Sequence, residues 1–324
     1  MDRTLAEGPV TPHRPLLVVA IGGNALLHRG QPPEIAIQRT NVRDAARALA
    51  ELAADHRLVI THGNGPQVGL LARQSEALAG VAPVPFDVLA AESEGLIGYL
   101  LAEELGRHLG PGTVVVVLTR VVVDARDPGF DTPTKPIGSM LEEAEAHRLA
   151  AEHGWAIALD GQGWRRVVAS PQPLEIVERG AIELLAGAGH VVVCAGGGGI
   201  PVAADRDGRL RGVEAVIDKD LTSALLAELL GADELLILTD VDAIFEGWGT
   251  DGAIPIRRTD TTTLRAGGWA AGSMGPKVEA ACRFAENTGR PARIGSLAHA
   301  GAVVAGEAGT LVDSPTRLSS RLPP

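Results

Sequence analysis

The chain has 324 residues, about the length of two domains or of one large α/β domain, with 45% hydrophobic and 21% charged residues, a balance typical of globular proteins. A formal net charge of -11 and an aromatic content of 3% argue against nucleic-acid binding, which needs a basic face and stacking rings. Apolar runs stay well below the roughly 18 residues that span a bilayer, so we expect a cytoplasmic protein with no membrane partner.

Strands and helices alternate after a polar leader over residues 1–14. Short apolar runs predict strands at 16–20, 58–61, 114–118, 191–195 and 235–239. Stretches without internal Gly or Pro predict helices at 36–54, 174–186 and 218–230. Continuous apolar strands are typical of a parallel sheet covered on both faces, so we predict a three-layer αβα sandwich with a mostly parallel, open sheet.

Two segments interrupt this alternation. Residues 124–166, called the lid below, open with Gly and Pro, lack a strong apolar strand, and predict a small protruding subdomain with a helix near 141–153. Residues 203–212 are rich in Asp, Arg and Gly, and we place the domain boundary there. The predicted parts are 1–213, including the lid, and 214–324.

Two glycine loops follow the first two predicted strands, in AIGGNAL and THGNGPQVG. Glycine lets a ligand approach the backbone closely, N–H groups at a helix start hold anions, and asparagine adds uncharged donors. An ordinary tight turn explains one such loop, whereas two matching loops favour a shared phosphate site. Neither has the spacing of a P-loop or a dinucleotide fingerprint. The predicted binding residues are Gly22, Gly23, Asn24, Gly63, Asn64 and Gly65.

A third loop, CAGGGGIP, follows the predicted strand at 191–195. A flexible linker is the alternative, but its position after a buried strand favours a ligand loop with Gly197 and Gly198 in contact with substrate. His62 lies beside the second loop, and we assign it no role. The two cysteines, Cys194 and Cys282, have apolar neighbours and predict buried thiols rather than a disulfide or a metal site.

Lysine is scarce, with only Lys135, Lys219 and Lys277 among the 29 residues that are Lys or Arg. Chance placement on the surface is the alternative to a special role. However, Lys219 follows a predicted N-cap, Asp218, and Lys277 follows a predicted helix-starting proline, where the helix dipole disfavours a cation unless an anion lies in front. Two lysines at helix starts and a third on the lid suit phosphoryl transfer.

Together the segments GGNAL, HGNGPQVG, PTKPIG, GWRRVV, CAGGGGIPV, GVEAVIDKD and GSMGPK closely resemble the carbamate kinases of the amino acid kinase superfamily. The resemblance covers nearly the whole chain. Ala20 stands where other superfamily members carry a lysine, and Lys135 in PTKP is implied to replace it. The departures are Ser139 and Ala169, where prolines are usual, and Gln172, where a lysine is common.

The resemblance implies an eight-stranded sandwich and a homodimer that transfers a phosphoryl group reversibly between carbamoyl phosphate and ADP. Lys135, Lys219 and Lys277 are implied to contact the transferring group, and Asp220 to organise Lys219 and Lys277. The cofactor implied is Mg²⁺ bound with ATP or ADP, with no metal ligand assigned to the protein. The implied nucleotide-binding residues are Lys219, Thr239, Asp240, Met274 and Lys277.

Two other readings stay open at this point. One is another small-molecule kinase of the same fold, such as an acetylglutamate-type kinase. The other is a non-catalytic nucleotide sensor, which retention of all three lysines and Asp220 argues against. ATP formation from carbamoyl phosphate and ADP would separate the three readings.

Overall fold

The computed structural model describes residues 14–28, 30–78, 80–161, 163–250, 252–269 and 274–315, without the side chains of Asn24 and Ala25. Eight of the described strands form one sheet in the order β15-β17-β16-β12-β1-β2-β9-β3. All neighbours in it are parallel except β16 and β17. The strands are β1 (Leu16–Ile21), β2 (Arg57–His62), β3 (Val114–Val117), β9 (Val191–Cys194), β12 (Glu234–Thr239), β15 (Arg258–Asp260), β16 (Ala292–Ser296) and β17 (Thr310–Asp313).

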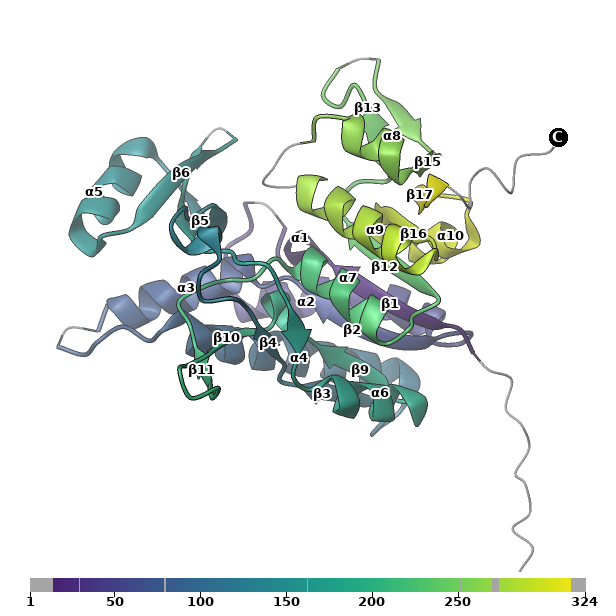
Figure 1. Cartoon of the computed structure of the whole chain (residues 1–324), viewed down its shortest axis with the longest axis horizontal. Coiled ribbons are helices and arrows are strands. Elements are labelled where there is room, and N and C mark those ends of the chain that lie inside the picture. Colours follow the sequence, from purple (N-terminus) through teal and green to yellow (C-terminus); the bar gives the residue numbers. More distant parts are fainter. Residues whose placement is uncertain are drawn as a thin grey trace, which may run out of the picture.

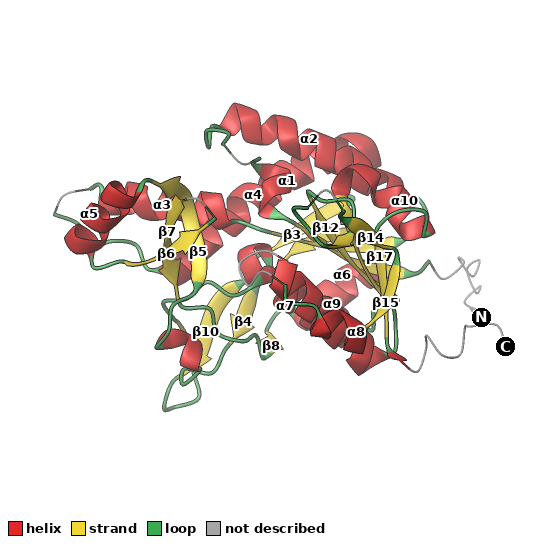
Figure 2. Ribbon diagram, turned by 90° about the horizontal axis from the view of Figure 1, so that it is seen from above, coloured by secondary structure: helices red, strands yellow, loops and turns green. Residues whose placement is uncertain are grey.

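Helices cover both faces of this sheet (Figure 2). One face packs on α2 (Ile35–Leu52), α4 (Phe86–Leu109) and α10 (Ala300–Ala305), and the other on α6 (Arg179–Gly187), α7 (Lys219–Leu229) and α9 (Met274–Thr288). Strand β1 is buried on both faces: Leu16, Val18 and Ala20 enter one core, and its other three residues enter the second. Since both faces need apolar residues, the continuous apolar run specified the three-layer sandwich correctly.

Smaller elements complete the chain. A four-stranded side sheet has the order β11-β10-β4-β8, and β13 and β14 form a hairpin. The strands are β4 (Arg120–Val122), β8 (Glu175–Ile176), β10 (Ile200–Ala204), β11 (Leu210–Gly212), β13 (Ile244–Glu246) and β14 (Ile254–Ile256). The remaining helices outside the lid are α1 (Gly23–Leu26), α3 (Gly65–Glu76), α8 (Thr261–Ala266), and the short 3-10 turns η2 (Gly196–Gly198) and η3 (Leu297–His299), while the 3-10 turn η1 (Pro128–Phe130) lies in the lid.

The lid protrudes from the body, as the sequence predicts (Figure 1). It contains β5 (Lys135–Leu141), α5 (Glu143–His153), β6 (Ala156–Asp160) and β7 (Gly163–Val168), with β7 between the other two strands in an antiparallel sheet. These strands are only half-buried, which explains why the sequence lacks a strong apolar run here. The predicted boundary near 203–212 coincides with the β10–β11 hairpin, while β1 and β12 pair directly across it. The division into 1–213 and 214–324 therefore stays a prediction.

Two helix predictions differ from the structure. The helix expected from Leu174 begins only at Arg179, because the backbone N–H of Leu174 donates to Val122 O and that of Val177 to Arg120 O, pairing this segment with β4. The long helix α4 was not predicted, since it contains glycines. Gly98 has a packing reason: a Cβ there would lie 2.5 Å from Val116 Cγ1 on β3.

Candidate active site

The first two glycine loops lie against each other at the carboxyl ends of β1 and β2. Gly22 N donates to Leu238 O at 2.9 Å, and Gly63 N donates to Ile21 O at 3.0 Å. A Cβ atom on Gly63 would lie 2.6 Å from the backbone N of Gly23, so no larger residue fits without a shift of the backbone. The two loops therefore lie together, while their role as a shared phosphate site stays a prediction. The side chain of Asn24 lies outside the described residues.

The third loop, after β9, packs onto the second. Asn64, the residue that precedes α3, donates from Nδ2 to Ser93 Oγ at 2.8 Å, and a Cβ on Gly197 would lie 2.0 Å from the same Nδ2. Gly197 and Gly198 have φ of 67° and 95°, and a Cβ on Gly198 would lie 2.4 Å from Ile217 O. Glycine is thus required here both by positive φ and by close approach. The loop therefore has one closely packed conformation and is not a flexible linker.

Helix α7 begins beside this loop and places Lys219 at its first turn. Asp218 is the N-cap: its Oδ1 accepts the N–H groups of Asp220 at 2.9 Å and Leu221 at 3.3 Å. Thr222 Oγ1 donates to Gly198 O at 3.0 Å, so the helix start is tied to the glycine loop. The predicted N-cap is confirmed, and it fixes the position of two buried charged residues.

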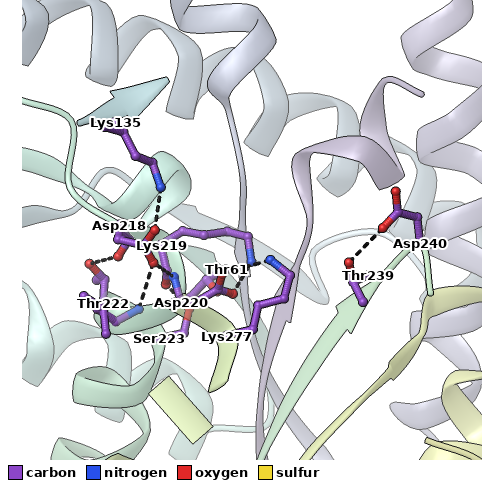
Figure 3. Close-up of polar contacts among 11 residues, drawn as sticks. Thr61, Lys135, Asp218, Lys219, Asp220, Thr222, Ser223, Thr239, Asp240 and Lys277 are labelled. Atoms are coloured by element: carbon purple, nitrogen blue, oxygen red, sulfur yellow. Dashed lines mark hydrogen bonds and ion pairs between the residues drawn. The ribbon is translucent and has the colours of Figure 1, made fainter. Parts of the chain in front are cut away.

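Asp220 joins two of the three lysines (Figure 3). Its Oδ1 accepts from Lys219 Nζ at 2.5 Å, and its Oδ2 accepts from Lys277 Nζ at 3.1 Å. Burial alone would raise the pKa of Asp220, but the two ammonium groups outweigh it and hold that pKa below its usual value. Burial lowers the pKa of Lys219. Burial also acts to lower the pKa of Lys277, but the Asp220 carboxylate outweighs burial, so that the pKa of Lys277 is raised overall.

Lys135 reaches the same place from the lid (Figure 3). It is the first residue of β5, and its Nζ donates to Asp218 Oδ2 at 2.5 Å. The three lysines, which lie up to 142 positions apart in the sequence, thus converge on the segment Asp218–Lys219–Asp220. Two carboxylates face three ammonium groups in this cluster.

The other predicted nucleotide residues flank the cluster. Thr239 ends β12, and its Oγ1 donates to Asp240 Oδ1 at 3.1 Å, to one side of the lysines in Figure 3. Met274 is the first residue of α9, one turn before Lys277, and it is half-buried against the core. Of the departures from the family pattern, Ser139 lies on β5, and Gln172 accepts from Arg283 Nη1 at 2.9 Å.

Glu94 supports the third loop and was missed in the sequence. It lies on α4, is 1% exposed, and accepts from the N–H of Gly196 at 2.9 Å and of Thr119 at 3.2 Å. Burial raises its pKa to about 8 despite these two bonds. His62 is fully buried against the same loop, and burial lowers its pKa to about 4, which keeps it neutral. No local sequence signal marks Glu94, because its partners are 25 and 102 positions away.

Both cysteines are buried and unreactive. Cys194 and Cys282 are 0% exposed and lie in the core, as the sequence predicts. Burial raises the pKa of Cys282 to about 12 and that of Cys194 well above its usual value, so neither is a reactive thiolate. Within the described ranges, no three His, Cys, Asp or Glu side chains gather into a metal-binding group, and no helix is long and apolar enough to cross a membrane.

Comparison with known proteins identifies the family of this chain. Residues 15–296 match the model of the amino acid kinase family. The carbamate kinase of Rhizobium meliloti (strain 1021) is 51% identical over 302 residues, which cover 92% of this chain and 93% of that protein. The carbamate kinase of Escherichia coli (strain K12) is 50% identical over 296 residues, which cover 91% of this chain and 98% of that protein.

Solved structures of carbamate kinases are similar to this chain over nearly its whole length. The structure of carbamate kinase from Giardia lamblia bound to citric acid is 39% identical, with a TM-score of 0.88, and the match covers 93% of this chain and 99% of that one. An N-acetylglutamate synthase from Neisseria gonorrhoeae is only 16% identical, with a TM-score of 0.55, and shares the fold alone.

Proposed function

The chain belongs to the amino acid kinase family and is a carbamate kinase, and we propose that Lys135, Lys219 and Lys277 carry its phosphoryl transfer. The reaction converts carbamoyl phosphate and ADP into ATP and carbamate, reversibly. The observation that carries the proposal is Asp220, whose two oxygens hold the ammonium groups of Lys219 and Lys277 in one buried place. The likeness to an N-acetylglutamate synthase extends to the fold alone and does not favour the acetylglutamate-type alternative.

The lysines supply what this chemistry needs. As the phosphoryl group passes between two oxygens, negative charge spreads over its equatorial oxygens, and fixed cations around it lower the barrier. Each ammonium has three N–H donors and gives one of them to a carboxylate, so donors remain for phosphoryl oxygens. Asp220 therefore acts as the organiser of Lys219 and Lys277, and no covalent phosphoenzyme is needed.

The glycine loops would hold the acyl phosphate. Gly23 and Gly65 begin α1 and α3 and bring backbone N–H groups to the carboxyl edge of the sheet, where helix starts favour an anion. The N–H groups of Gly22 and Gly63 donate to Leu238 O and Ile21 O, and these glycines let the two loops and the ligand approach closely. Asn64 is fixed by Ser93, and Gly197 and Gly198 pack against Asn64 and α7. We propose that carbamoyl phosphate binds within 1–213, with Asn24 and Asn64 as side-chain donors, and that the nucleotide binds within 214–324 near Thr239, Asp240 and Met274.

Magnesium enters with the nucleotide in this proposal. We propose that the ion is held by phosphate oxygens and water, the usual binding mode of Mg²⁺ with nucleotides. Both carboxylates at the cluster, Asp218 and Asp220, already bind lysines. When bound, the ion neutralises charge on the phosphates. The protein's own contribution is the three fixed ammonium groups.

A coupled assay tests the function. Purified protein is mixed with ADP, Mg²⁺ and either carbamoyl phosphate or acetyl phosphate, and ATP is followed; a third mixture holds ATP and N-acetylglutamate. We expect ATP from carbamoyl phosphate at a rate well above that of the other two reactions. Folded protein that forms no ATP from carbamoyl phosphate would refute the proposal. A homodimer and a cytoplasmic location are part of the same proposal, and sedimentation and cell fractionation test them.

A further inference from the structure

One carboxylate, that of Asp218, contacts both the lid and the start of α7. Its Oδ1 caps the helix by accepting the N–H of Asp220 at 2.9 Å, while its Oδ2 accepts from Lys135 Nζ at 2.5 Å. The Asp218 side chain is 9% exposed and that of Lys135 is 28% exposed, so the contact lies at the inner edge of the lid. The two oxygens of Asp218 therefore have different partners and different tasks.

Capping alone does not account for this arrangement. An N-cap needs one oxygen acceptor, which Asn or Ser provides about as well as Asp. Asp260 shows capping without a lysine: it caps α8, and its two oxygens accept from the N–H of Thr263 at 2.9 Å and from Thr263 Oγ1 at 3.0 Å. The second oxygen of Asp218 instead accepts a hydrogen bond from Lys135, which lies 83 positions away on the lid.

We infer that Asp218 is a positioning residue that fixes the Lys135 ammonium relative to Lys219 and Lys277. The inference rests on the proposed function. Asp218 precedes Lys219 directly and holds the backbone N–H of Asp220, which itself binds Lys219 and Lys277. The same helical turn thereby sets the position of all three ammonium groups, including the one that the lid delivers.

The physical reason is the length and freedom of the Lys135 side chain. A lysine carries its charge on a flexible four-carbon stem, and holding it in one place costs conformational entropy. A charge-assisted hydrogen bond offsets this cost before substrate arrives, and it uses only one of the three donors. Without the carboxylate, the ammonium leaves this place, and a misplacement of about 1 Å costs about 100-fold in rate.

The experiment is a cycle of the variants Asp218→Asn, Lys135→Ala and the double variant, with Asp260→Asn as the matched control. Asparagine keeps the cap oxygen and removes the charge. We expect Asp218→Asn to lower kcat by about 10- to 100-fold with KM for ADP within about twofold. In the Lys135→Ala background the same change should alter kcat by less than about twofold, since Asp218 acts through Lys135. Asp260→Asn should match wild type.

A second readout does not depend on activity. An ammonium that is bonded to a carboxylate must leave it before the amine can react, so Lys135 should be acetylated about three- to tenfold faster in Asp218→Asn. Mass spectrometry follows each of the three lysines separately. Unchanged Lys135 reactivity, or an equal kcat loss with and without Lys135, would overturn the inference. If wild type makes no ATP, the proposed function fails, and the acetylation rates alone decide whether Asp218 holds Lys135.

Discussion

Replacing Asp220 with asparagine should remove the negative charge that holds the ammonium groups of Lys219 and Lys277 in place. The Asp220 side chain is 4% exposed, and those of Lys219 and Lys277 are 9% and 14% exposed, so water screens the contacts little. Removing one partner of a buried ion pair costs about 3–5 kcal/mol, because the remaining charge is left uncompensated. We expect the free energy of unfolding to fall by about that amount.

Catalysis should fall as well, by about 10²–10³ in kcat, as when a charge-stabilising donor is lost. Urea unfolding gives the free energy, and the ATP-forming assay gives kcat. Because the folded pKa of Asp220 lies below its ordinary value of 3.8, its stabilising effect is fully present above that pH and is lost as the pH falls through the folded pKa. The stability difference from wild type should therefore be constant near neutrality and shrink only in acid.

Asp313 provides a matched control for this substitution. It is 0% exposed, lies on β17, and accepts from Arg258 Nη2 at 2.8 Å. Asp313→Asn should also destabilise the fold but leave kcat within about twofold, since its partner Arg258 lies on β15, outside the lysine cluster. If Asp220→Asn kept both wild-type stability and wild-type kcat, the reading of Asp220 as organiser would be wrong.

Further substitutions and one chemical modification test the remaining roles. Lys135→Ala should lower kcat by about 10²–10³ while ADP still binds, as measured by calorimetry; an unchanged kcat would remove the lid from the mechanism. Replacing Cys194 and Cys282 together by alanine should preserve turnover and cost at most about 1–3 kcal/mol per site in urea unfolding, so an inactive yet folded double variant would contradict their structural role. Mild acetylation should inactivate the enzyme, with protection by ADP plus carbamoyl phosphate, because it removes the lysine charges. Lys219→Arg and Lys277→Arg should each lose about 100-fold in rate through misplacement of the charge, and a fully acetylated protein with normal activity would mean that catalysis does not need the lysine charges.

Local sequence was sufficient for the central strands and the glycine loops. The strands carry uninterrupted apolar runs because both of their faces are covered, and this pattern is visible without knowledge of partners. The glycine loops could also be predicted from the sequence, because positive φ at Gly197 and the close approach of Gly63 to Gly23 exclude other residues at these positions. Helix α4 was missed because Gly98 resembles a helix breaker until Val116 is seen to pack against it.

The sequence by itself was sufficient to predict the layer architecture and the family, and to single out the three lysines by their scarcity. The family resemblance already implied that Asp220 organises Lys219 and Lys277. That Lys135 meets Asp218 was decided only by the tertiary structure, because these two residues lie 83 positions apart. No pattern within one element encodes such a contact. It exists because the lid, the start of α7 and the start of α9 are brought to one edge of the sheet, where Lys135 and Lys277 each bind a carboxylate from another part of the chain.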